Sequence, residues 1–140
     1  MIYSEIYEQI NSILENVTNV KEIHKNPTSK FTKYPAVVFF PSGVSNVFST
    51  TASDFREYSF KLFIVVGIDQ TTMENVFQNV MANTCDKVLQ AFSENWSMSN
   101  IEGRRTWVNV DSVGWSVDTS DKGLLAVAEY DIVVKLSVDI

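Results

Sequence analysis

Apolar and polar positions alternate along the chain in two distinct periods, and the first of them predicts two helices. At residues 2–17 apolar side chains recur at steps of three and four residues, which places them on one stripe of a helix. A second stripe extends to residue 92 behind Thr71 and Glu74, which stand at capping-box spacing. The pattern therefore predicts an N-terminal helix and a longer helix over residues 71–92.

Strand-like segments fill most of the remaining chain. Each is rich in β-branched and aromatic residues or alternates with the period of two that is typical of a half-buried strand. They are residues 34–41, 56–68, 106–117 and 124–140, with a short edge strand at residues 20–23. The third of the long segments changes parity near Asp111 and Ser112, which predicts a β-bulge there.

Two connecting segments complete the layout. Residues 42–54 are rich in Ser and Thr and lack a strong period, so we expect either a long loop or a mobile hairpin. Residues 118–123 have the composition of a turn. We expect a single domain over residues 1–140 with a flexible insertion at about residues 42–55. The fold class is α+β, a mostly antiparallel sheet with two helices packed on one face, in the order α-β-(loop/hairpin)-β-α-β-β.

Composition narrows the class of protein without naming a function. The 140 residues carry 11 basic and 17 acidic side chains, a net charge of −6 that argues against a general nucleic-acid binder. No apolar run reaches the roughly 18 residues of a membrane-spanning helix, and Met1 is not followed by a signal-peptide pattern. We therefore expect an intracellular protein that does not engage a membrane.

The residues that most often carry catalysis or bind metals are scarce. His24 is the single histidine, so no pair of histidines can bind a metal, and we expect an ordinary surface residue. Cys85 is the single cysteine, which excludes an internal disulfide, and its place on the second helix indicates a small buried side chain. No glycine-rich phosphate loop occurs among the five separate glycines. We expect no catalytic site, no metal and no cofactor.

Paired carboxylates and clustered lysines leave two alternatives open. The carboxylate pairs are Glu129 with Asp131 and Asp118 with Asp121. The first pair shares a strand face and suits acid–base chemistry or a hard cation, but a solvated strand face is the favoured explanation. The basic cluster contains Lys21, Lys25, Lys30 and Lys33, and Arg104 and Arg105 begin a later strand. With Phe31 and Tyr34 nearby, it fits a single-stranded nucleic-acid platform or, alternatively, a solvated loop or protein contact.

Aromatic and apolar residues outside the expected core suggest a surface that a partner covers. Phe31 and Trp96 belong to loops, and further apolar residues such as Val127 and Val133 fall on nominally polar strand faces. A second layer of the same chain is the alternative explanation. The residues that we expect at an oligomer or partner interface are Phe48, Phe55, Phe63, Val65, Trp107, Asp118, Asp121 and Lys122.

The order of elements resembles the tail terminator, or tail-completion, family of long-tailed bacteriophages. The likeness lies in the N-terminal helix, the Tyr-Pro-Ala-Val-Val-Phe-Phe strand at residues 34–40, and the Ser/Thr-rich insertion. It continues through the strand that begins at Arg56, the second helix and the C-terminal hairpin. It covers nearly the whole chain. Related neck and tail-assembly proteins of phages share this layout.

The resemblance implies a structural protein of the virion tail or neck, assembled in the host cytoplasm. Such proteins form a ring, typically of six subunits, that caps the tail tube, stops its polymerisation and joins it to the head connector. The implied partners are further copies of the chain, the tail tube protein and a head-completion protein. DNA passes through the lumen without specific binding, which a negative charge favours because carboxylates repel phosphates. A small α+β ligand-binding or regulatory module is the alternative from another class.

Overall fold

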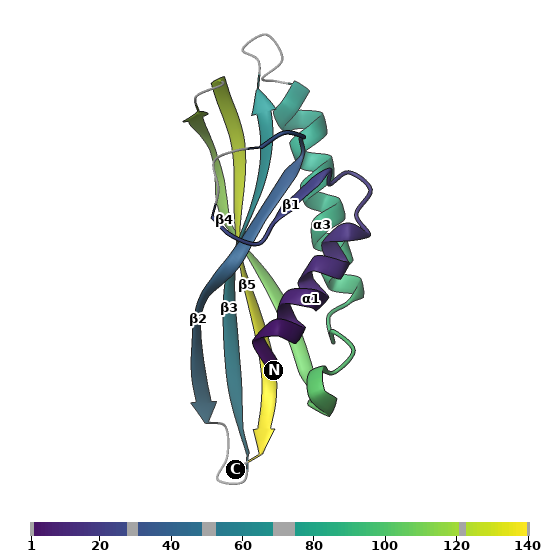
Figure 1. The fold of residues 1–140 in the computed structure, drawn as a ribbon, viewed down its shortest axis with the longest axis vertical. Coiled ribbons are helices and arrows are strands. Elements are labelled where there is room, and N and C mark those ends of the chain that lie inside the picture. The colour runs from purple at the N-terminus through teal and green to yellow at the C-terminus, as the bar shows by residue number, and fades with distance from the viewer. Residues whose placement is uncertain (1, 28–30, 49–52, 69–74, 121–122, 140) are drawn as a thin grey trace.

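The structure is a computed structural model that describes residues 2–27, 31–48, 53–68, 75–120 and 123–139. It is an α+β fold with a five-stranded sheet in the order β1-β2-β3-β5-β4. The strands are β1 (Glu22–His24), β2 (Ala36–Phe48), β3 (Ser53–Ile68), β4 (Thr106–Ser120) and β5 (Gly123–Asp139). The helical elements are α1 (Ile2–Glu15), η2 (Val76–Met81), α3 (Ala82–Glu94) and the short η3 (Ile101–Gly103). Helices α1 and α3 lie on the same side of the long, twisted sheet (Figure 1), as predicted.

The main core lies between these helices and the helix side of the sheet. The apolar stripe of α1 packs there, with Ile6, Ile10 and Leu14 fully buried. The ring of Tyr7 meets the edge of Phe60 with centroids 5.5 Å apart, and Phe60 itself has no exposed surface. Burial of this apolar stripe stabilises the packing of α1 on the sheet.

The second helix is confirmed in its described part and contains an irregularity that the sequence analysis missed. Its described part contains the π-helical turn η2, in which Val76 and Met81 are both buried although they lie five residues apart. The wider turn keeps them on the core side, and the stripe then continues through Cys85, Val88 and Phe92 of α3. Thr71 and Glu74, the expected capping box, lie outside the described residues.

The described residues of the 42–54 segment belong to two paired antiparallel strands, which favours the hairpin alternative over the long loop. Strand β2 continues to Phe48, and β3 begins at Ser53, with Val44 opposite Tyr58 in an antiparallel ladder. The register shifts between Pro41 and Gly43. That irregularity lets the strand continue past a proline, which has no N–H for the ladder. The flexibility expected at about residues 42–55 stays a prediction.

Strand β4 is longer than the sequence pattern indicated. The predicted bulge is confirmed as a register shift between Ser112 and Gly114. The ladder of β4 and β5 continues to Ser120 opposite Gly123. The connection between the two strands is therefore shorter than the turn expected over residues 118–123. Strand β1 is the predicted short edge strand and pairs parallel to β2.

None of the helices in the described ranges has the length and apolar character needed to cross a membrane.

Candidate interaction surface

The outer face of the sheet, opposite α1 and α3, collects most of the predicted interface residues. Tyr58, Phe60 and Leu62 of β3 belong to the main core. Because successive strand residues point to opposite faces, the residues between them point outward. The outer face thus carries Phe55, Lys61 and Phe63 from β3, with Glu129, Asp131 and Lys135 of β5 and Trp107 of β4 opposite them.

Two aromatic rings meet at one end of this face. Trp107 and Phe55 come from strands that flank β5, and their ring centroids are 5.6 Å apart at 63°. The guanidinium carbon of Arg105 lies 5.3 Å from the Trp107 ring centroid, and Lys135 Nζ lies 5.1 Å from that of Phe55. Each cation is attracted to the negative face of its ring. Phe55, Arg105, Trp107 and Lys135 are called the Trp107 cluster below.

In the middle of the outer face, Lys61 forms ion pairs with both Glu129 and Asp131. Its Nζ lies 2.7 Å from Asp131 Oδ1 and 3.2 Å from Glu129 Oε2. These hydrogen bonds, to Asp131 first and then to Glu129, raise the pKa of Lys61. The two carboxylates considered for acid–base chemistry therefore share one ammonium group. This arrangement favours a solvated, charge-balanced strand face.

The other end of the face is covered by the chain itself. Phe31 is buried there with Val38, Val65 and Val127 in a second, smaller core. Phe31, expected on the surface, is therefore an interior residue. Val65 is only 4% exposed, so it packs within its own chain in this structure and does not face a partner. A second layer of the same chain explains these two positions. Beside them Phe63 stacks on Phe40 with centroids 5.9 Å apart.

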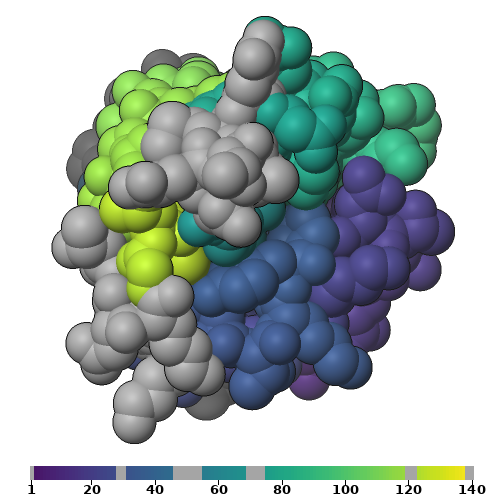
Figure 2. Space-filling model, turned by 90° about the horizontal axis from the view of Figure 1, so that it is seen from above, coloured from purple at the N-terminus to yellow at the C-terminus, as the bar shows by residue number. Residues whose placement is uncertain are grey.

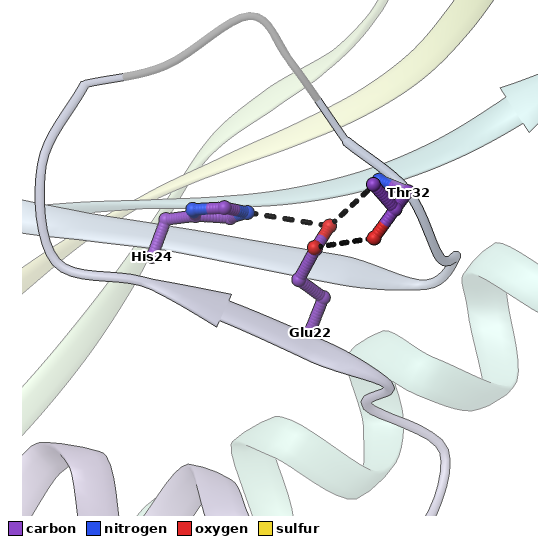
Figure 3. A network of polar contacts seen from close by, with 3 residues as sticks. All are labelled: Glu22, His24 and Thr32. Carbon is purple, nitrogen blue, oxygen red and sulfur yellow. Dashed lines mark hydrogen bonds and ion pairs between the residues drawn. The ribbon is translucent and has the colours of Figure 1, made fainter.

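A carboxylate anchors the segment that carries Phe31. Glu22 accepts hydrogen bonds from the Thr32 backbone N–H at 3.1 Å and from the Thr32 hydroxyl at 2.8 Å (Figure 3). The hydrogen bond from the Thr32 side chain is the main reason that the pKa of Glu22 is lowered to about 2. His24 Nε2 lies 3.2 Å from Glu22 Oε2, and its ring packs against Phe31. His24 is thus half-buried and structural, where a plain surface residue was expected.

The remaining predicted residues divide into described and undescribed positions. Asp118 is exposed on β4, and Phe48 lies opposite Asp54 at the end of β2. Asp121 and Lys122 lie outside the described residues, as does Lys30 of the basic cluster. Three of its lysines are exposed around β1: Lys21, Lys25 and Lys33.

Cys85 is a buried side chain, as predicted. Burial raises the pKa of its thiol. Burial and a hydrogen bond with Cys85 likewise raise the pKa of Tyr130 to about 12. Within the described ranges no group of three or more His, Cys, Asp and Glu side chains is arranged to hold a metal ion.

The sequence analysis missed an exposed apolar stripe on the edge strand β4. Val113, Trp115 and Val117 are 52%, 44% and 43% exposed. Their alternation was visible in the sequence, but it was used only to predict the β-bulge near Asp111 and Ser112. These three residues are called the β4 edge stripe below.

A groove between α3 and β4 lies beside the main core. It has a volume of about 270 Å³, and its walls include Leu89, Phe92, Val108 and Val110, with Trp96 also lining it. Ser93 and Asn109 are its polar lining residues. A small-molecule site usually adds several convergent polar groups to an apolar pocket, and two isolated side chains do not form such a set.

Comparison with known proteins finds similarity to chains of solved structures. No protein-family model and no curated protein matches this chain. A chain of the structure described as "Virion of native gene transfer agent (GTA) particle" is similar, with a TM-score of 0.44 and 11% identity. The match covers 96% of this chain and 92% of that chain. A likeness of this degree does not indicate a shared function, so function is inferred from the chain's own residues.

Proposed function

We propose that this protein is a structural subunit of a phage tail, a tail terminator that assembles as a ring on the last ring of the tail tube. In this role it stops polymerisation of the tube and joins it to the head connector. Six subunits is the number that the family resemblance implies. The protein is proposed to act without catalysis, in the virion, after assembly in the host cytoplasm.

The observation that carries the proposal is the Trp107 cluster on the uncovered outer face. Trp107, Phe55 and Arg105 belong to the residue types that most often dominate protein interfaces. They lie side by side at one end of a long sheet, on a face that no described helix covers. A surface of this kind suits a flat contact with another protein ring.

Three other functions receive less support. A nucleic-acid platform stacks successive bases on several aromatic rings beside the lysines, but Phe31 is buried, and of the predicted pair only Tyr34, 36% exposed, is accessible. An acid–base enzyme needs a free carboxylate, but Lys61 holds both Glu129 and Asp131. A ligand-binding module is the remaining alternative, because the groove beside Trp96 has space for a small apolar molecule.

The proposal is tested by polymerising a tail tube protein from the same source as this chain. Purified tube protein is allowed to assemble alone or with a small molar fraction of the chain, and tube lengths are measured by electron microscopy. We expect shorter tubes that carry the chain at one end. Unchanged tube lengths, with the chain left in the supernatant, would contradict the proposal.

A further inference from the structure

The two outer edges of the sheet are level with each other. A chain of paired residues links the two edges. Ile23 pairs with Val37, Val37 with Ile64, Ile64 with Ala128, and Ala128 with Trp115. Ile23 of β1 and Trp115 of β4 therefore lie at the same height and on the same helix side, four strand spacings or about 19 Å apart. The pairing directions also make β4 antiparallel to β1. Figure 2 shows the purple and blue N-terminal part and green β4 on opposite sides of the molecule.

The edge formed by β4 is apolar and acidic. It carries the β4 edge stripe, and among the described residues no further strand pairs with its outer side. Asp111 and Asp118 flank the stripe, and no Lys or Arg occurs from residue 108 to residue 120. Long apolar edge strands are normally protected, because they pair readily with other strands. A single copy leaves this edge in water.

The edge formed by β1 has the opposite charge. Lys21 and Lys25 flank the strand and are exposed, as is Lys33. Glu22, the acidic residue of this strand, has its carboxylate engaged by Thr32 and His24. Ile23 between them is half-buried on the helix side. This edge offers a short strand with an apolar residue between cations.

We infer that β4 of one copy docks antiparallel against β1 of the next copy, so that the sheet continues from subunit to subunit. The two edges are different surfaces on opposite sides of one chain, so the contact is head-to-tail. Head-to-tail contacts repeat until they close into a ring or extend as a filament. The inference rests on the proposed function and specifies the surfaces through which its ring forms.

Charge and register both favour this pairing over contact with an unrelated strand. The aspartates that flank Trp115 attract the lysines that flank β1 over distances comparable with the screening length of about 8 Å. Such attraction guides approach and disfavours edges of like charge. The register across the sheet places Glu22 of β1 level with Ser116 of β4, and β1 and β4 run antiparallel. Lys21, one residue earlier, is therefore level with Val117, one residue later, on the same helix side.

A charge series at position 117 tests this register. Val117→Lys places a cation beside Lys21 of the next copy, and we expect loss of assembly by light scattering. Val117→Glu is expected to assemble, and adding Lys21→Glu to Val117→Lys is expected to restore assembly. Val44→Lys is the matched control, because Val44 is 52% exposed on β2 and lies six residues beyond Val38, the last residue of β2 that pairs with β1. Equal effects of Lys at positions 44 and 117 would overturn the inference.

Disulfide trapping tests the contact itself, even where association is weak. A variant with Lys21→Cys and Val117→Cys is oxidised mildly and run on a non-reducing gel. We expect a ladder of linked copies, because paired strands bring Cα atoms within disulfide range, whereas about 19 Å within one copy prevents an internal bond. The control combines Lys21→Cys with Val44→Cys, and the two single variants control for buried Cys85.

The outcomes separate this inference from the proposed function. A ladder from a protein that leaves tube length unchanged would support the edge contact and contradict the tail terminator. Shortened tubes without a ladder above the control would overturn the edge contact and leave the terminator supported. Loss of tube binding in Val117→Lys, again without a ladder, would assign the β4 edge to a different partner and overturn the inference.

Discussion

The indole ring of Trp115 stacks on the ring of Phe77, with centroids 6.0 Å apart and planes 27° apart. The pair joins edge strand β4 to the helical turn η2, which lies on the helix side of the sheet. Trp115 is nevertheless 44% exposed, so the contact orients the indole without burying it. An aromatic side chain held in this way is prepared for a contact outside its own chain, because little conformational freedom remains to be lost on binding.

Replacing Trp115 by Ala is expected to weaken assembly in a chain that still folds. The folded monomer loses the stacking contact with Phe77 and the hydrogen bond between the Trp115 and Tyr130 side chains, each worth about 1 kcal/mol. The assembly loses a central interface residue, for which a loss of about 2 kcal/mol, or roughly 30-fold in affinity, is typical. Urea unfolding and light scattering measure the two effects separately.

Trp96→Ala is the matched control for that variant. Trp96 is 55% exposed and lies outside the β4 edge stripe. We expect it to assemble like the unaltered chain. Equal weakening of assembly by both substitutions would show that general surface hydrophobicity, and not the edge contact, drives association.

Replacing Trp107 by Ala is expected to remove binding to the tail tube while leaving the fold intact. The side chain packs on the surface with Phe55 and Arg105, so the cost to folding stays near 1 kcal/mol. Co-sedimentation with preformed tubes measures the binding, again with Trp96→Ala as the control. Normal co-sedimentation of the Trp107 variant would remove the Trp107 cluster from the tube contact.

Acid is expected to loosen the segment held by Glu22. The pKa of this carboxyl group falls from 4.5 to about 2 on folding, chiefly because the Thr32 side chain donates a hydrogen bond to it. The resulting stabilisation is fully present above pH 4.5 and is lost as the pH falls from 4.5 towards about 2. We expect Glu22→Gln to be less stable at pH 7 by about 1–2 kcal/mol and to lose less stability in that acid range.

Urea unfolding between pH 2 and pH 7, at low protein concentration, measures this dependence. Glu8→Gln is the control, because Glu8 is an exposed glutamate on α1. If the Glu22 and Glu8 variants follow the same acid profile, the anchoring role of Glu22 is wrong.

Phe60 is expected to be one of the most sensitive core positions. It is fully buried, and the rings of Tyr3 and Tyr7 meet it with centroids 6.0 Å and 5.5 Å away. Truncation to Ala leaves a cavity beneath α1 and is expected to cost about 3–5 kcal/mol. Val44→Ala, at an exposed strand position, is expected to change stability by less than about 0.5 kcal/mol. Urea unfolding at neutral pH distinguishes the two, and similar midpoints would contradict the assigned core.

Cys85 is expected to resist thiol reagents in the native protein. It is 3% exposed, and burial raises the pKa of its thiol, so little reactive thiolate forms. Labelling with a chromogenic disulfide reagent at pH 8 is expected to follow the rate of unfolding and to become rapid in urea. Rapid stoichiometric labelling without urea would show that the second helix opens readily at this position.

Much of the fold was predictable because the spacing of apolar residues along a helix or strand shows which side of that element is buried. The stripe of α1 and the alternation of β3 and β5 each match the face that packs in the main core. The parity change near Asp111 likewise predicted the bulge that ends at Gly114. Where the conformation of a segment depends on the strand that pairs with it, the local sequence pattern did not predict that conformation. Residues 42–48 have weak strand character, and they form a strand because residues 53–60 pair with them.

The candidate surface was harder to predict than the fold. Phe31 and Phe55 have similar local sequence signals, yet the first is buried and the second packs with Trp107 on the outer face. The difference arises because Glu22 binds Thr32 and thereby fixes Phe31 over Val65, a long-range relation that no period reveals. For the same reason Trp115 could not be recognised as exposed. Its environment depends on the position of η2 beside β4, where Phe77 contacts it.

The most direct test of the account is the length of tails assembled without this chain. The gene is deleted from the genome that encodes it, and tails are measured by electron microscopy before and after the unaltered gene is restored. We predict overlong tubes of variable length that are not joined to heads, with normal tails on restoration. Tails of normal, uniform length attached to heads in the deletion strain would contradict the account.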